Sequence, residues 1–194
     1  MNSRPRAAGR AGVGSRLRIG VSTLIFGLLG VLPIQAAAQD KPNTLSETYE
    51  NWVVRCVVSA AAVGAAPAKA CEMAQDIRKR SGGERVLAVV IGVKPGETKP
   101  KLTLLTPLGL QLSDGVRLFL DAEQKPLVDL TYATCFAAGC IVMTDFTPSL
   151  SDRLAKGTSV RVAMRVYQGQ SAEVPVSLRG FDVARKRLDE LEGN

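Results

Sequence analysis

Cys56, Cys71, Cys135 and Cys140 are the side chains of this 194-residue chain with the widest chemical range. A cysteine can bind a metal as the thiolate, exchange electrons with a second thiol, or form a structural disulfide. None of the spacings is the C-x-x-C of redox and zinc motifs, which disfavours a redox pair and a four-thiolate metal site. The even number and the export signal described below favour disulfides, for which four cysteines allow three pairings.

We expect the two local pairs, Cys56–Cys71 and Cys135–Cys140. Cys56 lies in a strand-like run and Cys71 begins the next one, so a bridge between them would join neighbouring strands. Cys135 and Cys140 enclose four residues, of which Gly139 can supply the positive φ that a tight turn needs. Loop entropy predicts stabilisation of about 3 kcal/mol by the first pair and about 2 kcal/mol by the second.

The chain contains no histidine, and this absence removes much catalytic chemistry. Ser-His-Asp and Cys-His nucleophiles, histidine acid–base catalysis and nearly all catalytic zinc sites need an imidazole. The sequence also lacks G-x-S-x-G, a phosphate-binding glycine loop and a dinucleotide fingerprint. We therefore expect a protein without catalytic residues, metal or cofactor. The enzymatic alternative is a hydrolase of envelope glycans, which needs two carboxylates roughly 5–9 Å apart in a cleft.

The first 38 residues have the pattern of a secretory signal peptide. Five arginines and no acidic residue precede the apolar run 19–34, and the small-residue triplet 36–38 follows it. We expect cleavage after Ala38. An uncleaved anchor is the alternative, but a run of 16 residues is shorter than the roughly 20 that an apolar helix needs to cross a bilayer. No cysteine follows the run to accept a lipid, so we expect a soluble exported protein with no membrane span after cleavage.

Removal of this segment would change the charge of the protein. The full chain has 25 Lys+Arg and 18 Asp+Glu, and the segment holds five of the basic residues, which leaves 20 basic against 18 acidic residues. A net charge of +2 does not predict binding to nucleic acid. The roughly 156 remaining residues suit one domain. We expect a flexible leader over residues 39–50 and a single β-rich domain over residues 51–194.

Short apolar runs alternate with Gly, Pro and Asp turn signals from residue 51 onward. The runs cover residues 52–58, a stretch led by Cys71, and residues 84–93, 101–105, 116–120, 127–134, 141–146, 159–167 and 172–178. Strands at this spacing predict an all-β fold, an antiparallel β-sandwich or barrel-like domain.

Two helices are predicted among the strands. Residues 147–157 begin with a threonine cap and a proline and end at a glycine, which indicates a short internal helix. At the C-terminus, Phe181, Ala184, Leu188 and Leu191 recur at helical spacing between charged residues, which predicts an amphipathic helix. We expect this helix to pack on the sheet, and binding to a membrane or a partner is the alternative.

The densest basic run of the predicted domain is a candidate site for a polyanion. Arg78, Lys79, Arg80 and Arg85 lie in a predicted turn between strands and could bind lipopolysaccharide or a host glycosaminoglycan. No aromatic residues interleave with them, so a solvated hairpin tip is the favoured interpretation. Trp52 is the only tryptophan, and its place on a strand before Cys56 favours packing over a disulfide in the core rather than a ligand platform.

Several of these motifs together resemble the invasion-associated locus B family of exported bacterial proteins. The matching residues are Trp52-x-x-x-Cys56, Cys71, Pro107-Leu108-Gly109-Leu110 with Leu112, Gly115 and Val116, Cys135-x-x-x-Gly139-Cys140, and Ser177-Leu178-x-Gly180-Phe181-x-x-Ala184. The resemblance covers about Asn51 to Leu188. It implies a β-rich exported protein of alphaproteobacterial type, in a family whose founding member is linked to entry into host cells, and it implies no catalytic residues.

The functional expectation is an exported, non-enzymatic binding protein of the periplasm or cell surface. Its partner would be an envelope or host-surface component. With a host-surface partner, the protein would contribute to host-cell interaction or invasion. The alternative is a periplasmic envelope-maintenance or chaperone-like factor with no host contact. The sequence identifies neither the partner nor the binding face.

Overall fold

A computed structural model describes residues 44–59, 68–94 and 96–193 of the chain. The predicted signal peptide and the first part of the predicted leader lie outside these residues. The strands are β1 (Thr44–Tyr49), β2 (Trp52–Ser59), β3 (Ala68–Arg78), β4 (Arg85–Val93), β5 (Pro100–Thr106), β6 (Val116–Leu120), β7 (Val128–Leu130), β8 (Tyr132–Phe136), β9 (Gly139–Asp145), β10 (Ser159–Arg165) and β11 (Ser171–Ser177). The helices are α1 (Pro148–Lys156), α2 (Phe181–Glu192) and one 3₁₀ turn, η1 (Leu112–Asp114).

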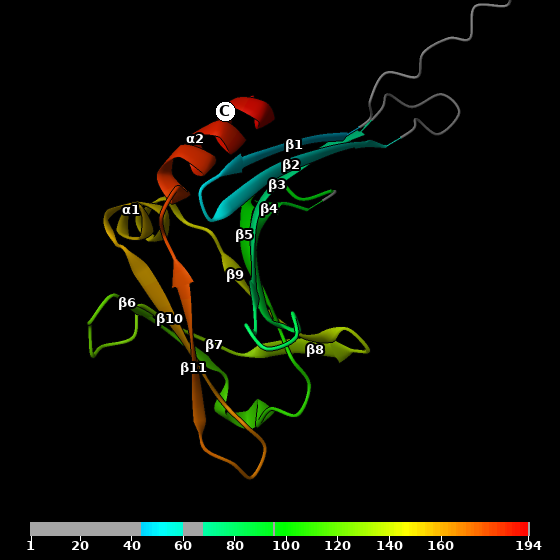
Figure 1. Cartoon of the computed structure of the whole chain (residues 1–194). Helices are drawn as coiled ribbons and strands as arrows, with labels where there is room; N and C mark the ends of the chain where they lie inside the picture. The colour runs from blue at the N-terminus through cyan, green and yellow to red at the C-terminus, as the bar shows by residue number, and fades with distance from the viewer. Residues whose placement is uncertain (1–43, 60–67, 95, 194) are drawn as a thin grey trace, which may run out of the picture. The chain divides into compact units, whose positions relative to one another are not determined.

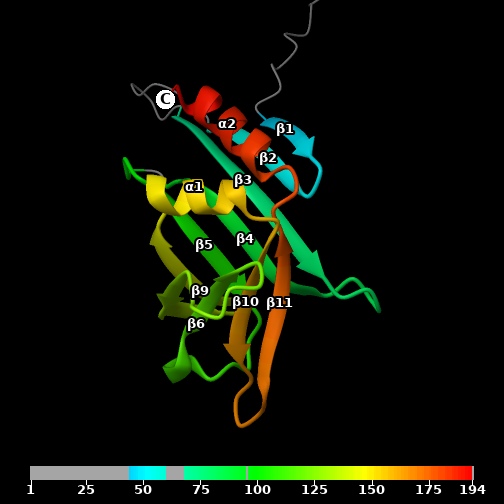
Figure 2. The ribbon, with the colours of Figure 1, turned by 90° about the vertical axis from the view of Figure 1, so that its left-hand side faces the viewer.

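The strands form two antiparallel sheets (Figures 1 and 2). The larger sheet has seven strands in the order β1-β2-β3-β4-β5-β9-β8, and the smaller has four in the order β11-β10-β6-β7. Over the described ranges both sheets are open, so the sandwich-like alternative of the prediction holds and the barrel-like one does not. The predicted strand 127–134 is divided between the sheets, because β7 pairs with β6 whereas β8 pairs with β9.

Both disulfides have the predicted local pairing. Cys56 lies directly opposite Cys71 in the β2–β3 ladder, and Cys135 lies opposite Cys140 in the β8–β9 hairpin. Gly139 in that hairpin has a φ of +138°, and a Cβ there would come within 2.1 Å of the Thr106 carbonyl oxygen. The tight turn therefore depends on this glycine, as its spacing predicted.

The hydrophobic core lies between the sheets and under α2. Trp52 and Phe181 are each only 1% exposed, and their rings meet edge to face with centroids 5.3 Å apart. The indole N–H of Trp52 donates to the Ser177 carbonyl at 3.0 Å, which satisfies its one buried donor. Trp52 is thus a core residue, as predicted, and its aromatic partner is the first residue of α2.

The prediction of a flexible leader is wrong for its second half, because Thr44–Tyr49 form strand β1 against β2. Alternate residues of β1 point toward α2, where Leu45 and Tyr49 pack against the core. Glu47, on the same face, accepts hydrogen bonds at 2.7 and 3.0 Å from the Arg187 guanidinium of α2. These hydrogen bonds lower the pKa of Glu47.

Both predicted helices are present. The Thr147 hydroxyl caps α1 by accepting the Leu150 N–H at 3.2 Å. Helix α2 buries Phe181, Ala184 and Leu188 and contacts β1, β2 and β3, which confirms the predicted packing on the sheet (Figure 1).

A single aspartate connects the end of β6 to the start of β10. Asp121 has a φ of +46°, and its carboxylate accepts hydrogen bonds from the Thr158 hydroxyl at 2.6 Å and from the Thr158 and Ser159 backbone N–H groups at 2.9 and 2.8 Å. The hydrogen bond from the Thr158 side chain is the main reason why the pKa of Asp121 is lowered.

Candidate binding groove

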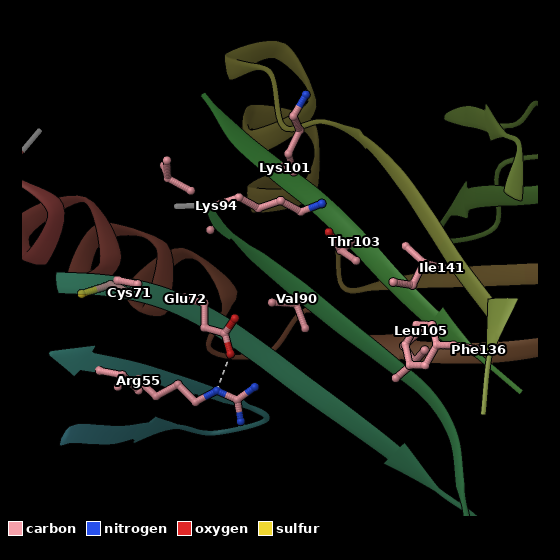
Figure 3. Close-up of a pocket in the computed structure, with 14 residues that line it drawn as sticks. Arg55, Cys71, Glu72, Val90, Lys94, Lys101, Thr103, Leu105, Phe136 and Ile141 are labelled. Atoms are coloured by element: carbon pink, nitrogen blue, oxygen red, sulfur yellow. Dashed lines mark hydrogen bonds and ion pairs between the residues drawn. The ribbon is translucent and has the colours of Figure 1, made fainter. Parts of the chain in front are cut away.

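A groove with a volume of about 420 Å³ lies on the outer face of the seven-stranded sheet (Figure 3). It is built by residues of β2, β3, β4, β5, β8 and β9, together with Lys94 just after β4. The lining residues are Arg55, Val57, Ala70, Cys71, Glu72, Val90, Gly92, Val93, Lys94, Lys101, Thr103, Leu105, Phe136 and Ile141. This face points away from the core, because the alternate residues of the same strands, such as Val89, Ile91 and Leu104, are buried between the sheets.

The strand register sets the floor of the groove. Val90 pairs with Thr103, and Leu105 pairs with Ile141, so Thr103 and Leu105 of β5 lie between Val90 of β4 and Ile141 of β9. Phe136, which is 47% exposed, extends from the β8–β9 hairpin beside Leu105 (Figure 3). An antiparallel sheet with one face in the core usually presents polar residues on the other face. An apolar outer face is therefore the feature of this sheet that needs a functional explanation.

Gly92 allows two strands to approach closely at one end of the groove. A Cβ at this position would lie 2.7 Å from the Cys71 carbonyl oxygen and 3.0 Å from the Glu72 Cβ. Its φ is not in the left-handed region, so the requirement for glycine is steric. Larger residues at this position would push β3 and β4 apart and alter the groove wall.

Three cations and one carboxylate line the groove. Arg55 forms an ion pair with Glu72 across β2 and β3 (Figure 3). Lys101 forms an ion pair with Asp145 at 2.7 Å; this hydrogen bond raises the pKa of Lys101 and lowers that of Asp145. The third cation, Lys94, differs from Arg55 and Lys101 in its contacts.

Within the described residues, no carboxylate lies within ion-pair distance of the Lys94 ammonium. Its Nζ atom instead lies 2.6 Å from the Met143 sulfur, which is a weak acceptor. The groove therefore holds one cation that other side chains leave without a strong partner.

The residues predicted to bind a polyanion lie elsewhere, at the β3–β4 hairpin. Arg78 donates to the Gly83 carbonyl, Lys79 pairs with Glu84 at 2.7 Å, and both Arg78 and Arg85 lie 4.0 Å from Asp76. Arg80 is exposed at the same turn. The hairpin thus gathers the four basic residues, but nearby carboxylates offset part of their charge. Polyanion binding by Arg78, Lys79, Arg80 and Arg85 stays a prediction.

A second hollow, of about 450 Å³, lies where α1 and α2 meet the ends of β5 and β9. Its lining includes the carboxylates of Asp145, Asp152 and Asp189, so it is the place to consider the glycan-hydrolase hypothesis. A general acid needs a raised pKa, yet the hydrogen bond from Lys101 lowers the pKa of Asp145. Asp189 is held by Arg185 at 2.9 Å. These contacts give the hypothesis no support, and an activity assay remains its test.

The disulfides leave no thiolate for a metal site. All four cysteines are bonded in pairs, so a four-thiolate metal site is not available in this state. In the part of the chain that the structure describes, no three His, Cys, Asp or Glu side chains are arranged to hold a metal ion. None of the helices in that part is long and apolar enough to span a membrane.

The fold and its two bridges define a class of small, disulfide-bonded proteins with two antiparallel sheets. Within that class, the sequence profile described as "Invasion associated locus B (IalB) protein" matches residues 52–189. The chain belongs to this family, as its motifs predicted.

Named relatives agree with this assignment. The chain is 29% identical over 174 residues to an invasion protein B homologue of Brucella abortus (strain 2308), covering 89% of this chain and 95% of the relative. It is 28% identical over 164 residues to invasion protein B of Bartonella bacilliformis, covering 82% and 83%. The crystal structure of invasion associated protein B from Bartonella henselae superposes with a TM-score of 0.64 at 26% identity, covering 77% of this chain and 97% of that one. These relatives and the disulfides are consistent with an exported protein.

The groove was not among the predicted sites, although the sequence carries a signal for it. Residues 86–91 are apolar without interruption, whereas a strand with one solvated face would alternate. Such a run indicates that both faces of the strand meet apolar surroundings. The runs of β5 and β9 that complete the floor could be assigned to it only once their register was known.

Proposed function

We propose that this protein is an exported, non-enzymatic binding protein that holds an apolar partner in the groove on the seven-stranded sheet. The observation that carries the proposal is the row of aliphatic side chains on the outer face of β4, β5 and β9. Burial of this surface by a partner would contribute about 25 cal/mol for each Å² of apolar area removed from water. The lining contains one carboxylate, Glu72, which is already paired with Arg55, so the groove is better suited to binding than to acid–base chemistry.

The proposal has two versions, which differ in where the protein acts. In the first, the protein is at the cell surface or secreted, and its partner belongs to the host; the relatives' name, invasion protein B, supports this version. In the second, it is a periplasmic factor that maintains the envelope or protects a client, with no host contact. The apolar groove favours the second version, because an envelope supplies apolar partners at high local concentration.

Site-specific photocrosslinking in the living bacterium tests the proposal. A photoreactive phenylalanine analogue would replace Val90 on the groove floor, and in a matched strain it would replace Val183, which is 55% exposed on α2. We expect light-dependent adducts from the Val90 position and few from the Val183 position. Equal adducts from both positions, or none from Val90, would contradict a role for the groove.

Protease treatment of the same cells, before and after the outer membrane is permeabilised, separates the two versions. Cleavage on intact cells supports the surface version. Protection until permeabilisation supports the periplasmic one.

A further inference from the structure

The hydrogen-bonding groups that the groove floor offers indicate which class of molecule can bind there. The floor consists of side chains on β3, β4, β5 and β9, and each of these strands has a paired neighbour on both sides. Their backbone N–H and C=O groups are therefore committed to the sheet. Arg55, Glu72, Lys94 and Lys101 also line the groove, but among Val90, Thr103, Leu105 and Ile141 on β4, β5 and β9 the Thr103 hydroxyl is the one polar group.

This composition disfavours an extended peptide. A peptide lying across the floor would bring an N–H and a C=O per residue and find almost nothing to bond them, which is costly when they leave water. A peptide can instead add to a sheet edge, where free backbone groups exist. An aliphatic chain carries no such groups, so it can cover Val90, Leu105 and Ile141 without leaving a polar group unsatisfied.

The size of the groove fits one chain. A volume of about 420 Å³ equals that of about 14 liquid waters at about 30 Å³ each. A methylene group fills a similar volume, so a single chain of about 12 carbons with a small headgroup is accommodated.

The charge of the groove selects the headgroup. Lys94 and Lys101 both lie on the side of the groove away from Phe136, and the Lys94 side chain extends toward Thr103 (Figure 3). Lys101 already has Asp145 as a partner, whereas the Lys94 ammonium contacts the Met143 sulfur and forms no ion pair with any carboxylate of the described residues. An anionic group at this end would give Lys94 a charged hydrogen-bond partner.

We propose that the groove binds a free long-chain carboxylate, with its aliphatic chain over Val90 and Leu105 and its carboxylate at Lys94. This inference rests on the proposed function, since it names the partner of the same groove. It implies a carrier or scavenger of single-chain amphiphiles, a chemistry available wherever bacterial or host membrane lipids are hydrolysed.

Calorimetric titration of the purified, disulfide-bonded protein tests the inference. The probes are octanoate, decanoate and dodecanoate below their micelle concentrations, with dodecyltrimethylammonium as the cation of matched chain length. Because the groove is open on one side, each methylene is about half buried, and affinity should rise about fourfold for every two carbons. Dodecanoate should bind more tightly than dodecyltrimethylammonium.

Variants separate the floor from the headgroup site. Val90→Glu should weaken dodecanoate binding at least tenfold, whereas Val183→Glu, the same change at an exposed valine on α2, should not. Lys94→Gln should weaken dodecanoate several-fold and leave dodecyltrimethylammonium unchanged, and Lys125→Gln, in an exposed loop, should change neither. Urea unfolding of each variant identifies any change that comes from loss of fold.

Several outcomes overturn the inference. Affinity that does not depend on chain length, equal binding of the anion and the cation, or equal effects at Lys94 and Lys125 would each do so. A dimer of the wild type that Val90→Glu dissociates would also do so, since a second copy would then fill the groove. If Val90 forms adducts in cells but no carboxylate binds, the inference is wrong and the proposed function stands; if Val90 forms no adducts, the proposed function itself is wrong.

Discussion

Removal of the Cys135–Cys140 disulfide should both weaken the fold and release one wall of the groove. The bridge closes a sequence separation of five residues, for which loop entropy gives about 2 kcal/mol. Cys56–Cys71 closes a separation of 15 residues, for which the same argument gives about 3 kcal/mol. Cys56 and Cys71 are both buried, so removal of their sulfur atoms also leaves small cavities, which add to the loss of stability. Cys135→Ala/Cys140→Ala should therefore lower the free energy of unfolding less than Cys56→Ala/Cys71→Ala.

Urea unfolding, followed by tryptophan fluorescence, measures how much each double variant lowers the free energy of unfolding. Trp52 is the sole tryptophan and is 1% exposed, so its emission reports on the core without labelling. The slope of free energy against urea should rise in both variants, because an unfolded chain without a cross-link is less compact and exposes more surface.

The same variants give a functional readout, because Phe136 lies between the two cysteines of the short hairpin. Loss of that bridge should weaken binding in the groove, whereas loss of Cys56–Cys71 should act mainly on stability. A larger loss of stability from the Cys135–Cys140 variant, or a cost below about 0.5 kcal/mol for either, would refute the loop-entropy reasoning.

Two further changes test the core and the loops. Phe181→Ala should cost about 4 kcal/mol, because it empties a fully buried aromatic position against Trp52; a circular-dichroism melt in urea with a cost below about 1 kcal/mol would be inconsistent with this packing. Asp121→Asn should cost about 1 kcal/mol at pH 7, since the carboxylate accepts several hydrogen bonds but is partly exposed. The pKa of Asp121 is lowered in the folded state, so its stabilisation is complete above the unfolded value near 3.8 and is lost as the pH falls through the folded value. The difference between wild type and variant should therefore shrink in acid, and a difference that grows there would contradict the hydrogen-bond geometry.

Most strands of this fold could be predicted because apolar runs and turn residues mark them locally. The run 127–134 reads as one strand because nothing in it marks a change of sheet, yet β7 and β8 pair with different partners. That division is decided by packing between the two sheets. Local patterns therefore located the strands better than they assigned them to sheets.

Strand β1 could not be predicted with the same rules. Its sequence alternates, but Glu47 occupies a position where an apolar residue would have indicated a buried face. The charge is tolerated there because Arg187, 140 residues later, pairs with it. Only the tertiary structure brings these two residues together.

The groove was missed for a related reason. Each lining residue is unremarkable alone, and their meeting depends on the register of strands from separate parts of the chain. The cysteine pairs, by contrast, were predictable because each is local in sequence.

The contact between the first strand and the last helix also sets the order in which the molecule can fold. A polypeptide made from its N-terminus exposes β1, β2 and β3 long before α2 exists, so Trp52 has no Phe181 to cover it until residue 181 has been made. Such contacts between distant parts of the sequence slow folding and prolong exposure of apolar surface. A chain that ends before residue 181 therefore retains every groove residue but lacks the helix that covers Trp52 on the opposite, core-facing side of the sheet.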